Sequence, residues 1–207
     1  MKSIKNIIFD LGAVIINIDV PLTFSKFAQI SNKEPDEVKS IFLQNKLIER
    51  HEVGELTDEG FRNEIQKLLN IQTSHTEIDA IWNALLLDIP KERIDLIQQL
   101  AKKYNLYMLS NTNGIHFPIV ENILLETTGI NTFEKLFKKV YLSHEIQLRK
   151  PHLPIYEHVL STSNLAAHET LFIDDNFDNI QGASKLGIQT IHLQHPYTIV
   201  DSLKAYV

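Results

Sequence analysis

The stretch Ile7-Ile8-Phe9-Asp10-Leu11-Gly12 places a short run of β-branched and aromatic residues directly before a carboxylate and a glycine. Such a run is typical of a buried strand, and the carboxylate then stands at the strand's carboxyl end. Two later apolar runs end in the same way: residues 106–109 precede Ser110-Asn111, and residues 170–173 precede Asp174-Asp175. Segments with helical spacing lie between these runs, and strands that alternate with helices predict βαβ units. We therefore predict the α/β class, with a mainly parallel, Rossmann-like sheet core.

The chain changes character after the first predicted strand. Between residues 17 and 87, apolar residues recur at helical spacing, and no segment has a convincing strand pattern. We predict three or four helices here, one of which begins after Thr57 or Asp58, since both are good N-cap residues. The predicted organisation is an α/β core domain of residues 1–16 and 88–207, interrupted by an all-helical domain of residues 17–87.

The composition is that of an ordinary globular protein, and it excludes several functional classes. Of 207 residues, 43% are hydrophobic, and 20 basic against 26 acidic residues give a formal net charge of −6. A net acidic chain argues against a general nucleic-acid-binding surface, and the lack of cysteine excludes disulfides, thiolate metal sites and a cysteine nucleophile. Asp10 and Asp19 interrupt the apolar N-terminal stretch, and the chain has no uninterrupted apolar run of about 18 residues. We expect a cytoplasmic protein with no nucleic-acid or membrane partner; the sequence does not indicate an oligomeric state.

The polar residues that follow the three apolar runs are candidates for a common site. In an open parallel sheet, ligands bind outside the carboxyl ends of the strands, so Asp10, Ser110 and the pair Asp174-Asp175 are expected to converge if these strands are neighbours. Three clustered carboxylates would repel one another without a cation, and they suit a hard divalent ion such as Mg²⁺. Taken singly, each of these residues is also explained as a turn residue or a helix cap. The three together, in this order, favour phosphoryl chemistry with Mg²⁺.

The same residues resemble the motifs of the haloacid dehalogenase (HAD) superfamily of hydrolases, and the resemblance covers nearly the whole chain. The family's nucleophilic aspartate is matched by Asp10, and its serine or threonine motif by Ser110. Lys150, in Arg149-Lys150-Pro151, matches the lysine motif, and Asp174-Asp175 matches the acidic pair. The four motifs occur in the family's order, and the combination is highly specific. The resemblance implies that the helical insert is a cap domain, which encloses the site and sets specificity.

One position departs from the usual pattern of the phosphatases in this family. Most of them carry a second aspartate two residues after the nucleophile, which protonates the leaving group, and here that position is Gly12. Two subgroups lack this acid: the 2-haloacid dehalogenases, whose halide needs no proton, and phosphatases similar to the bacterial α-D-glucose-1-phosphate phosphatase. The second subgroup carries the strings Asp-Leu-Gly, Ser-Asn-Thr-Asn and Asp-Asp-Asn, which are all present here. Because dehalogenases have no use for two adjacent carboxylates, the pair Asp174-Asp175 favours the phosphatase.

The resemblance implies a Mg²⁺-dependent phosphatase that acts on a small phosphorylated metabolite through an aspartyl-phosphate intermediate. Sugar 1-phosphates are the first candidates, because an anomeric oxygen is a better leaving group than an ordinary alcohol. The implied site residues are Asp10, Ser110 and Lys150 for catalysis; Ser110, Asn111, Thr112 and Lys150 for substrate binding; and Asp10, the Gly12 carbonyl, Asp175 and Asp174 for the metal. Which member of the acidic pair ligates the metal directly stays open. Two alternatives also stay open: a 2-haloacid dehalogenase, and a catalytically weak phosphometabolite-binding module.

Several further residues have a functional and a structural explanation of similar weight. Asn179 could steady the metal ligands or cap a helix, and His116 could face the site or lie exposed on the surface. The segment 50–55, with Arg50 and His51, lies where caps of this type place their specificity loop, but it also fits a solvated charge run between helices. The same two explanations apply to Asn113 and Trp82.

Overall fold

A five-stranded parallel sheet forms the centre of the structure. The computed structural model describes residues 4–207, and its strands are ordered β3-β2-β1-β4-β5, with every neighbouring pair parallel. The strands are β1 (Asn6–Phe9), β2 (Asn105–Ser110), β3 (Lys139–Leu142), β4 (Thr170–Asp174) and β5 (Gln189–His192). This arrangement confirms the predicted α/β class with a Rossmann-like core. It also places β1, the strand before Asp10, between β2 and β4.

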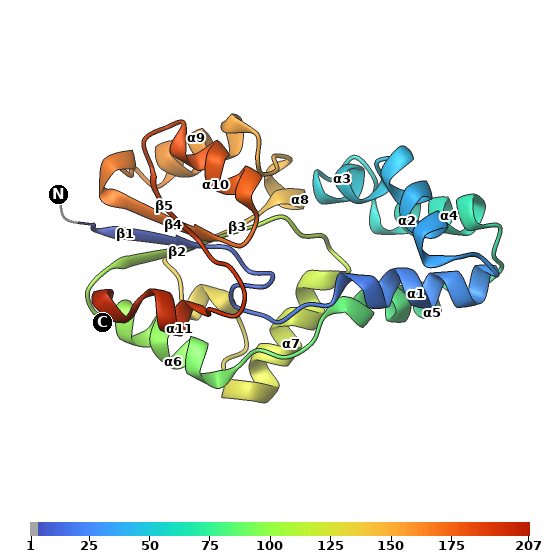
Figure 1. Cartoon of the computed structure of the whole chain (residues 1–207), viewed down its shortest axis with the longest axis horizontal. Helices are drawn as coiled ribbons and strands as arrows, with labels where there is room; N and C mark the ends of the chain where they lie inside the picture. Colours follow the sequence, from blue (N-terminus) through green and yellow to red (C-terminus); the bar gives the residue numbers. More distant parts are fainter. Residues whose placement is uncertain (1–3) are drawn as a thin grey trace.

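Helices cover both faces of this sheet. On one side lie α6 (Lys91–Leu100), α7 (His116–Thr128) and α11 (Ile199–Ser202), and on the other lie α9 (Leu153–Thr162) and α10 (Phe177–Ser184) (Figure 1). Ile7 and Phe9 are buried against the first group, whereas Ile8 is buried against the second. Successive side chains of a strand point to opposite faces, so a strand that is apolar at every position has to be covered on both sides. The remaining short elements are α8 (Ser143–Ile146), η2 (Phe133–Lys135), η3 (Ala167–Glu169) and η4 (Lys204–Tyr206).

Residues 17–87, which the structure describes throughout, fold into helices only. These are α1 (Val20–Ser31), α2 (Pro35–Gln44), α3 (Leu47–Glu52), α4 (Asp58–Leu69), α5 (His75–Trp82) and the 3₁₀ turn η1 (Asn83–Leu85). The prediction of three or four helices is therefore too low, because α3 is only six residues long and too short for a clear helical period. Thr57 is the N-cap of α4, and its Oγ1 accepts the Gly60 N–H at 3.0 Å. The apolar side chains of these helices form a hydrophobic cluster of their own, which includes Phe27, Phe42 and Phe61.

The two segments that join these helices to the sheet lie side by side. The Asn17 N–H donates to the Asp88 carbonyl at 2.9 Å, and the Leu87 N–H donates to the Asn17 carbonyl at 3.0 Å. The chain therefore leaves the core and returns to it at one place. We propose on this ground that residues 17–87 form a separate helical domain on a core of residues 1–16 and 88–207. Among residues 4–207, no helix combines the length and the apolar character that crossing a membrane requires.

Candidate active site

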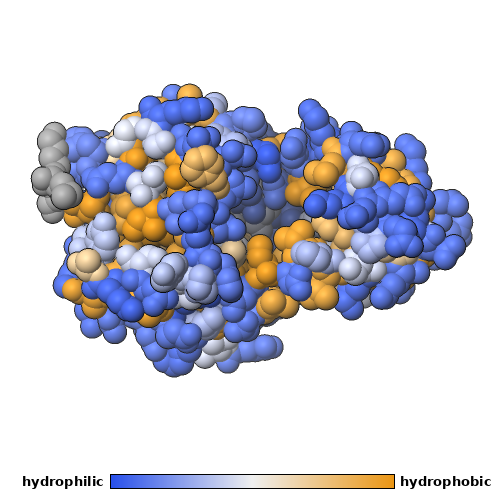
Figure 2. Space-filling view, viewed as in Figure 1, coloured by the Kyte–Doolittle hydropathy of each residue, from blue (hydrophilic) through white to orange (hydrophobic). Residues whose placement is uncertain are grey.

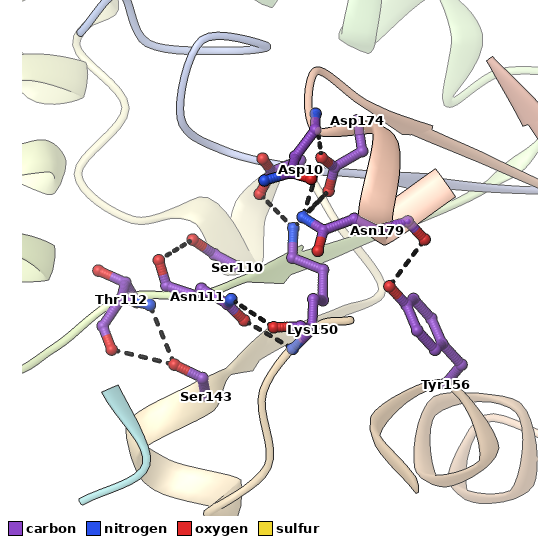
Figure 3. A network of polar contacts seen from close by, with 10 residues as sticks. Asp10, Ser110, Asn111, Thr112, Ser143, Lys150, Tyr156, Asp174 and Asn179 are labelled. Atoms are coloured by element: carbon purple, nitrogen blue, oxygen red, sulfur yellow. Dashed lines mark hydrogen bonds and ion pairs between the residues drawn. The ribbon is translucent and has the colours of Figure 1, made fainter. Parts of the chain in front are cut away.

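The polar residues at the carboxyl ends of β1, β2 and β4 lie together in the structure. Because β1 is the middle one of these three strands, the parallel register brings Asp10, Ser110 and Asp174 to one edge of the sheet. Figure 3 shows Asp10 and Asp174 close to each other, with the Lys150 side chain reaching them from below. In the loop after Asp10, Ala13 adopts a left-handed backbone conformation with a φ of 56°. Such strain is costly for a residue with a side chain and occurs preferentially at functional sites.

Lys150 joins two of these carboxylates. Its Nζ donates to Asp10 Oδ1 at 2.6 Å and to Asp174 Oδ2 at 2.7 Å, and its side chain is 1% exposed. A buried ammonium is costly unless it is paired and hydrogen-bonded, and the two carboxylates satisfy both conditions. Burial alone would lower the pKa of Lys150, but Asp10 and Asp174 raise it above its ordinary value. Lys150 is therefore held as a cation between the two aspartates.

Asn111 and Thr112 make structural contacts around this lysine. The Asn111 side chain accepts the Lys150 N–H at 2.9 Å and donates to the Lys150 carbonyl at 3.0 Å, so it holds the backbone on both sides of that residue. Ser143, at the start of α8, accepts the Thr112 N–H and donates to the Thr112 carbonyl, each at 3.0 Å. These contacts engage the Asn111 side chain and the Thr112 backbone with the protein, and the substrate-binding roles of both residues stay predictions. The buried Ser143 was not among the predicted residues, because nothing in the sequence around it distinguishes it.

Asp174 is fully buried, and both of its oxygens accept hydrogen bonds from the protein. Oδ1 accepts the Asn176 N–H at 2.8 Å, and Asn179 Nδ2 lies 3.0 Å from each oxygen. The Asn179 carbonyl in turn accepts the Tyr156 hydroxyl at 2.9 Å (Figure 3). Asn179 therefore orients an acidic residue of the site. The N-cap of α10 is Asn176, so the explanation of Asn179 as a helix cap is wrong.

A divalent cation fits the acidic residues of this site. Asp10, Asp174 and Asp175 each offer a carboxylate oxygen within 4.8 Å of the others. When all three are ionised, three negative charges and the single positive charge of Lys150 leave two negative charges, which a divalent cation balances. Burial raises the pKa of Asp10 to about 7 against the lowering effect of Lys150, and burial and the Asp174 charge raise the pKa of Asp175. Clustered carboxylate oxygens suit Mg²⁺, and participation of the Gly12 carbonyl stays a prediction.

A cavity of about 180 Å³ opens beside the carboxylates, between the sheet and the helical domain. Gly12 and Ser110 belong to its wall, and the helical domain contributes Phe24 and Trp82. Within the described part of the chain, the Ser110 hydroxyl makes one long contact of 3.4 Å, to the Asn111 carbonyl, so it is available to a ligand. A pocket of this kind next to clustered ionisable groups is where a substrate binds in most enzymes.

His116 and Trp82 lie together in the wall of this cavity. Their rings stack with centroids 4.7 Å apart, and His116 Nδ1 lies 2.7 Å from Asn83 Oδ1. His116 is buried, so the prediction that it lies exposed on the surface is wrong. Burial and the charge of the neighbouring His51 lower the pKa of His116 to about 3. Asn113 is buried as well and lines the same cavity.

The cavity contact that segment 50–55 makes does not come from Arg50 or His51, the two residues that the sequence suggested. His51 pairs with Asp58 at 2.8 Å and Arg50 with Glu55 at 2.7 Å, both within the helical domain, and neither His51 nor Arg50 is among the described residues that line the cavity. His51 is buried, so the solvated charge run does not describe it. The residue of this segment that reaches the cavity wall is Glu52.

Glu52 also forms an ion pair that the sequence analysis did not predict. Arg149 donates to Glu52 Oε2 from Nε at 3.1 Å and from Nη2 at 2.8 Å. This pair ties α3 of the helical domain to the residue directly before Lys150. The two partners are 97 positions apart in the chain, and no local pattern links them. Only the folded structure brings them together.

At the end of the central strand, the Asp10 carboxylate is paired with the buried Lys150 and lies beside the carboxylates of Asp174 and Asp175. The family model of haloacid dehalogenase-like hydrolases matches residues 4–187. The chain therefore belongs to the haloacid dehalogenase-like hydrolase family, as the motif resemblance predicts.

Relatives of known activity extend this assignment. The D-ribitol-5-phosphate phosphatase of Bacteroides thetaiotaomicron is 29% identical over 189 residues, which cover 90% of each chain. The glyceraldehyde 3-phosphate phosphatase of Methanocaldococcus jannaschii is 26% identical over 208 residues, which cover 92% of this chain and 85% of the relative. The crystal structure of a HAD family enzyme from Bacteroides thetaiotaomicron in complex with magnesium and inorganic phosphate has a TM-score of 0.89 and 33% identity, over 98% of this chain and 100% of that one. The chain is thus an enzyme of the hydrolase class whose relatives include phosphatases.

Proposed function

We propose that this protein is a Mg²⁺-dependent phosphatase that hydrolyses a small phosphorylated metabolite through an aspartyl-phosphate intermediate. The observation that carries the proposal is the position of Lys150, whose ammonium lies 2.6 Å from Asp10 and 2.7 Å from Asp174. A cation at this point favours the ionised form of Asp10, which a nucleophile requires, and stabilises negative charge that develops on a phosphoryl group beside it. The similar enzyme from Bacteroides thetaiotaomicron, crystallised with magnesium and inorganic phosphate, supports the proposal.

The residues of the chain have separate tasks in this reaction. Asp10 attacks phosphorus in line and forms the aspartyl-phosphate, which water then hydrolyses. The Ser110 hydroxyl donates to a phosphoryl oxygen, and Lys150 balances charge on Asp10 and on the transferring group.

The metal ligands would be Asp10, the Gly12 carbonyl and the acidic pair. A bound Mg²⁺ neutralises charge on the phosphate oxygens. Within the pair, Asp175 is exposed, whereas both oxygens of Asp174 already accept hydrogen bonds from the protein. This difference favours Asp175 as the direct ligand and gives Asp174 the task of orienting Lys150.

The leaving group has to depart without help from residue 12. Gly12 has no side chain that could donate a proton, so a leaving oxygen that is stable as an anion is favoured. Sugar 1-phosphates meet this condition through their anomeric oxygen, and they are the substrates that the sequence predicts. A halide meets it too, but the acidic pair Asp174-Asp175 would then have no task, which favours the phosphatase over the 2-haloacid dehalogenase.

Phosphate release with and without a chelator tests the proposal. With Mg²⁺, the wild-type protein is expected to release phosphate from members of a panel of phosphate monoesters, and EDTA is expected to stop the release. The nearly isosteric Asp10→Asn variant should lose turnover, whereas Asp95→Asn, on the exposed side of α6, should keep it. An active Asp10→Asn variant would refute the assignment of the nucleophile. Chelator-insensitive halide release would support the dehalogenase, and tight phosphometabolite binding without turnover would support the binding module.

A further inference from the structure

The cavity beside the carboxylates has one polar and one apolar side. The polar side comes from Ser110, the last residue of β2, and from the residues that follow it. The apolar side comes from the segment before α1 and from the helical domain, and includes Ile16, Ile18, Phe24 and Leu85. Figure 2 shows hydrophobic surface gathered where the helical domain joins the core. A ligand with its phosphate near Asp10 would therefore have its remaining part against apolar side chains.

Polar side chains near this apolar side already have partners in the protein. Thr23 is fully buried, and its Oγ1 donates to the Trp82 carbonyl at 3.2 Å. Asn113 Oδ1 accepts the N–H groups of Ile115 and His116, at 3.1 and 3.0 Å. A ligand hydroxyl in this region would lose its hydrogen bonds to water without gaining these atoms as partners.

Away from the polar side that begins at Ser110, few polar atoms remain for a ligand. Because His116 Nδ1 donates to Asn83 Oδ1, the neutral ring presents Nε2 as an acceptor. Glu52 uses Oε2 for Arg149, which leaves Oε1. Trp82 Nε1 has no hydrogen-bond partner among residues 4–207, but it is buried, so a ligand in the cavity does not reach it. Such isolated groups can serve one or two polar atoms of a ligand, but not the row of hydroxyls that a sugar or a polyol carries.

The free volume limits the size of the ligand. The cavity measures about 180 Å³, and an apolar cavity of about 150 Å³ holds a benzene molecule. A branched or aromatic hydrocarbon group of that size would fill it.

From these observations we infer that the organic part of the substrate is compact and apolar. The substrate is then the phosphate monoester of a small branched or aromatic alcohol, rather than of a polyol or of the sugar 1-phosphate that the leaving group alone would favour. The inference rests on the proposed function, because it places the phosphate at Asp10. An apolar group would release water from Ile18, Phe24 and Leu85, which is favourable in proportion to the area covered. The relative from Bacteroides thetaiotaomicron is named for D-ribitol-5-phosphate, and this chain would differ from it in substrate class.

The test compares two esters of primary alcohols, and the hydroxyl beside the ester in ribitol makes its leaving group slightly the better one, which works against the expected ratio. 3-Methylbutyl phosphate and D-ribitol 5-phosphate are both esters of primary alcohols, so the ratio of their kcat/KM values reports how the cavity receives the rest of the molecule. With Mg²⁺ present, we expect kcat/KM to be at least about tenfold higher for 3-methylbutyl phosphate, because one unpaired buried hydroxyl costs about that factor. A smaller ratio, with phosphate release from either ester, would overturn the inference and leave the phosphatase proposal intact. If no ester in the set released phosphate, phenyl phosphate included, the proposed function itself would be refuted.

A pair of matched variants links the preference to the cavity wall. Ile18→Thr keeps a β-branched side chain and adds a hydroxyl to the apolar side, and it is expected to lower the ratio at least about threefold. Ile30→Thr makes the same change on α1, at a side chain that is 37% exposed and does not line the cavity, and it should leave the ratio unchanged. An unchanged ratio in Ile18→Thr, or an equal change in both variants, would show that this cavity does not receive the substrate and would overturn the inference.

Discussion

Gly12 allows a direct test of how this enzyme works without the usual acid. The Gly12→Asp substitution would place a carboxyl where most phosphatases of the family carry one. The structure has room for its Cβ, which among residues 4–207 would approach Ile18 Cδ1 at 3.4 Å, an ordinary van der Waals contact. Gly12 is also outside the left-handed region of the backbone, so a side chain introduces no strain there.

The expected gain depends on the leaving group. A well-placed general acid contributes about 10²- to 10⁴-fold to a rate. A carboxyl at position 12 would share a partly buried site with other carboxylates, and both conditions raise its pKa and favour the form that carries the proton. We expect kcat for an alkyl phosphate to rise at least about tenfold. The expected gain is below the largest contributions of a general acid, because no neighbouring side chain orients the new carboxyl. For phenyl phosphate, whose phenolate leaves readily without a proton, we expect less than about a twofold change.

Steady-state phosphate release with Mg²⁺ checks this expectation for 3-methylbutyl and phenyl phosphate. The control is Gly12→Asn, which fills the same space but has no acidic proton to transfer. A gain that is confined to Gly12→Asp and to the alkyl ester would establish acid catalysis by the introduced carboxyl. An equal gain in both variants, or no gain in either, would refute the reasoning that Gly12 marks a missing acid.

Three further outcomes are expected. Gly182→Ala would bring a Cβ to 2.5 Å from the Pro151 carbonyl oxygen, and such overpacking should cost about 1–3 kcal/mol of unfolding free energy, measured in urea. Arg149→Met leaves the Glu52 carboxylate without its partner and should cost about 3 kcal/mol, of which the double variant with Glu52→Gln should recover a large part. Burial lowers the pKa of His116 from 6.5 to about 3, so between these pH values His116 is protonated in the unfolded chain and neutral in the folded chain. The free energy of unfolding therefore decreases as the pH is lowered through this range, by up to about 1.4 kcal/mol per pH unit. His116→Phe should remove that part of the slope, which urea midpoints at a series of acidic pH values would show; an unchanged slope would contradict the placement of a neutral ring in the core.

The strand ends could be predicted because their signals are local. The run Ile7-Ile8-Phe9 is apolar at every position because β1 is covered on both faces, and a few adjacent residues suffice to show it. The N-cap Thr57 is visible for the same reason, since its bond to Gly60 spans three positions. By contrast, α3 has only six residues, and a helix of that length is stabilised by its packing rather than by its own pattern.

The environment of single side chains was the least predictable part of the site. His116 and His51 are polar residues in segments that also suit solvent, and the structure buries both. Their burial depends on partners from other elements, namely Trp82 for His116 and Asp58 for His51. A sequence pattern records the character of neighbours along the chain, and it does not record these partners.

By itself, the sequence determined the alternation of strands and helices, the acidic and hydroxyl residues at strand ends, and the Arg149-Lys150-Pro151 motif, because these patterns extend over only a few neighbouring positions. The tertiary structure decided which distant residues meet. It placed Lys150 between Asp10 and Asp174, and it joined Glu52 to Arg149 across 97 positions. The apolar side of the cavity was decided in the same way, since its walls come from segments that become neighbours only when the strand order and the packing of the helical domain are established.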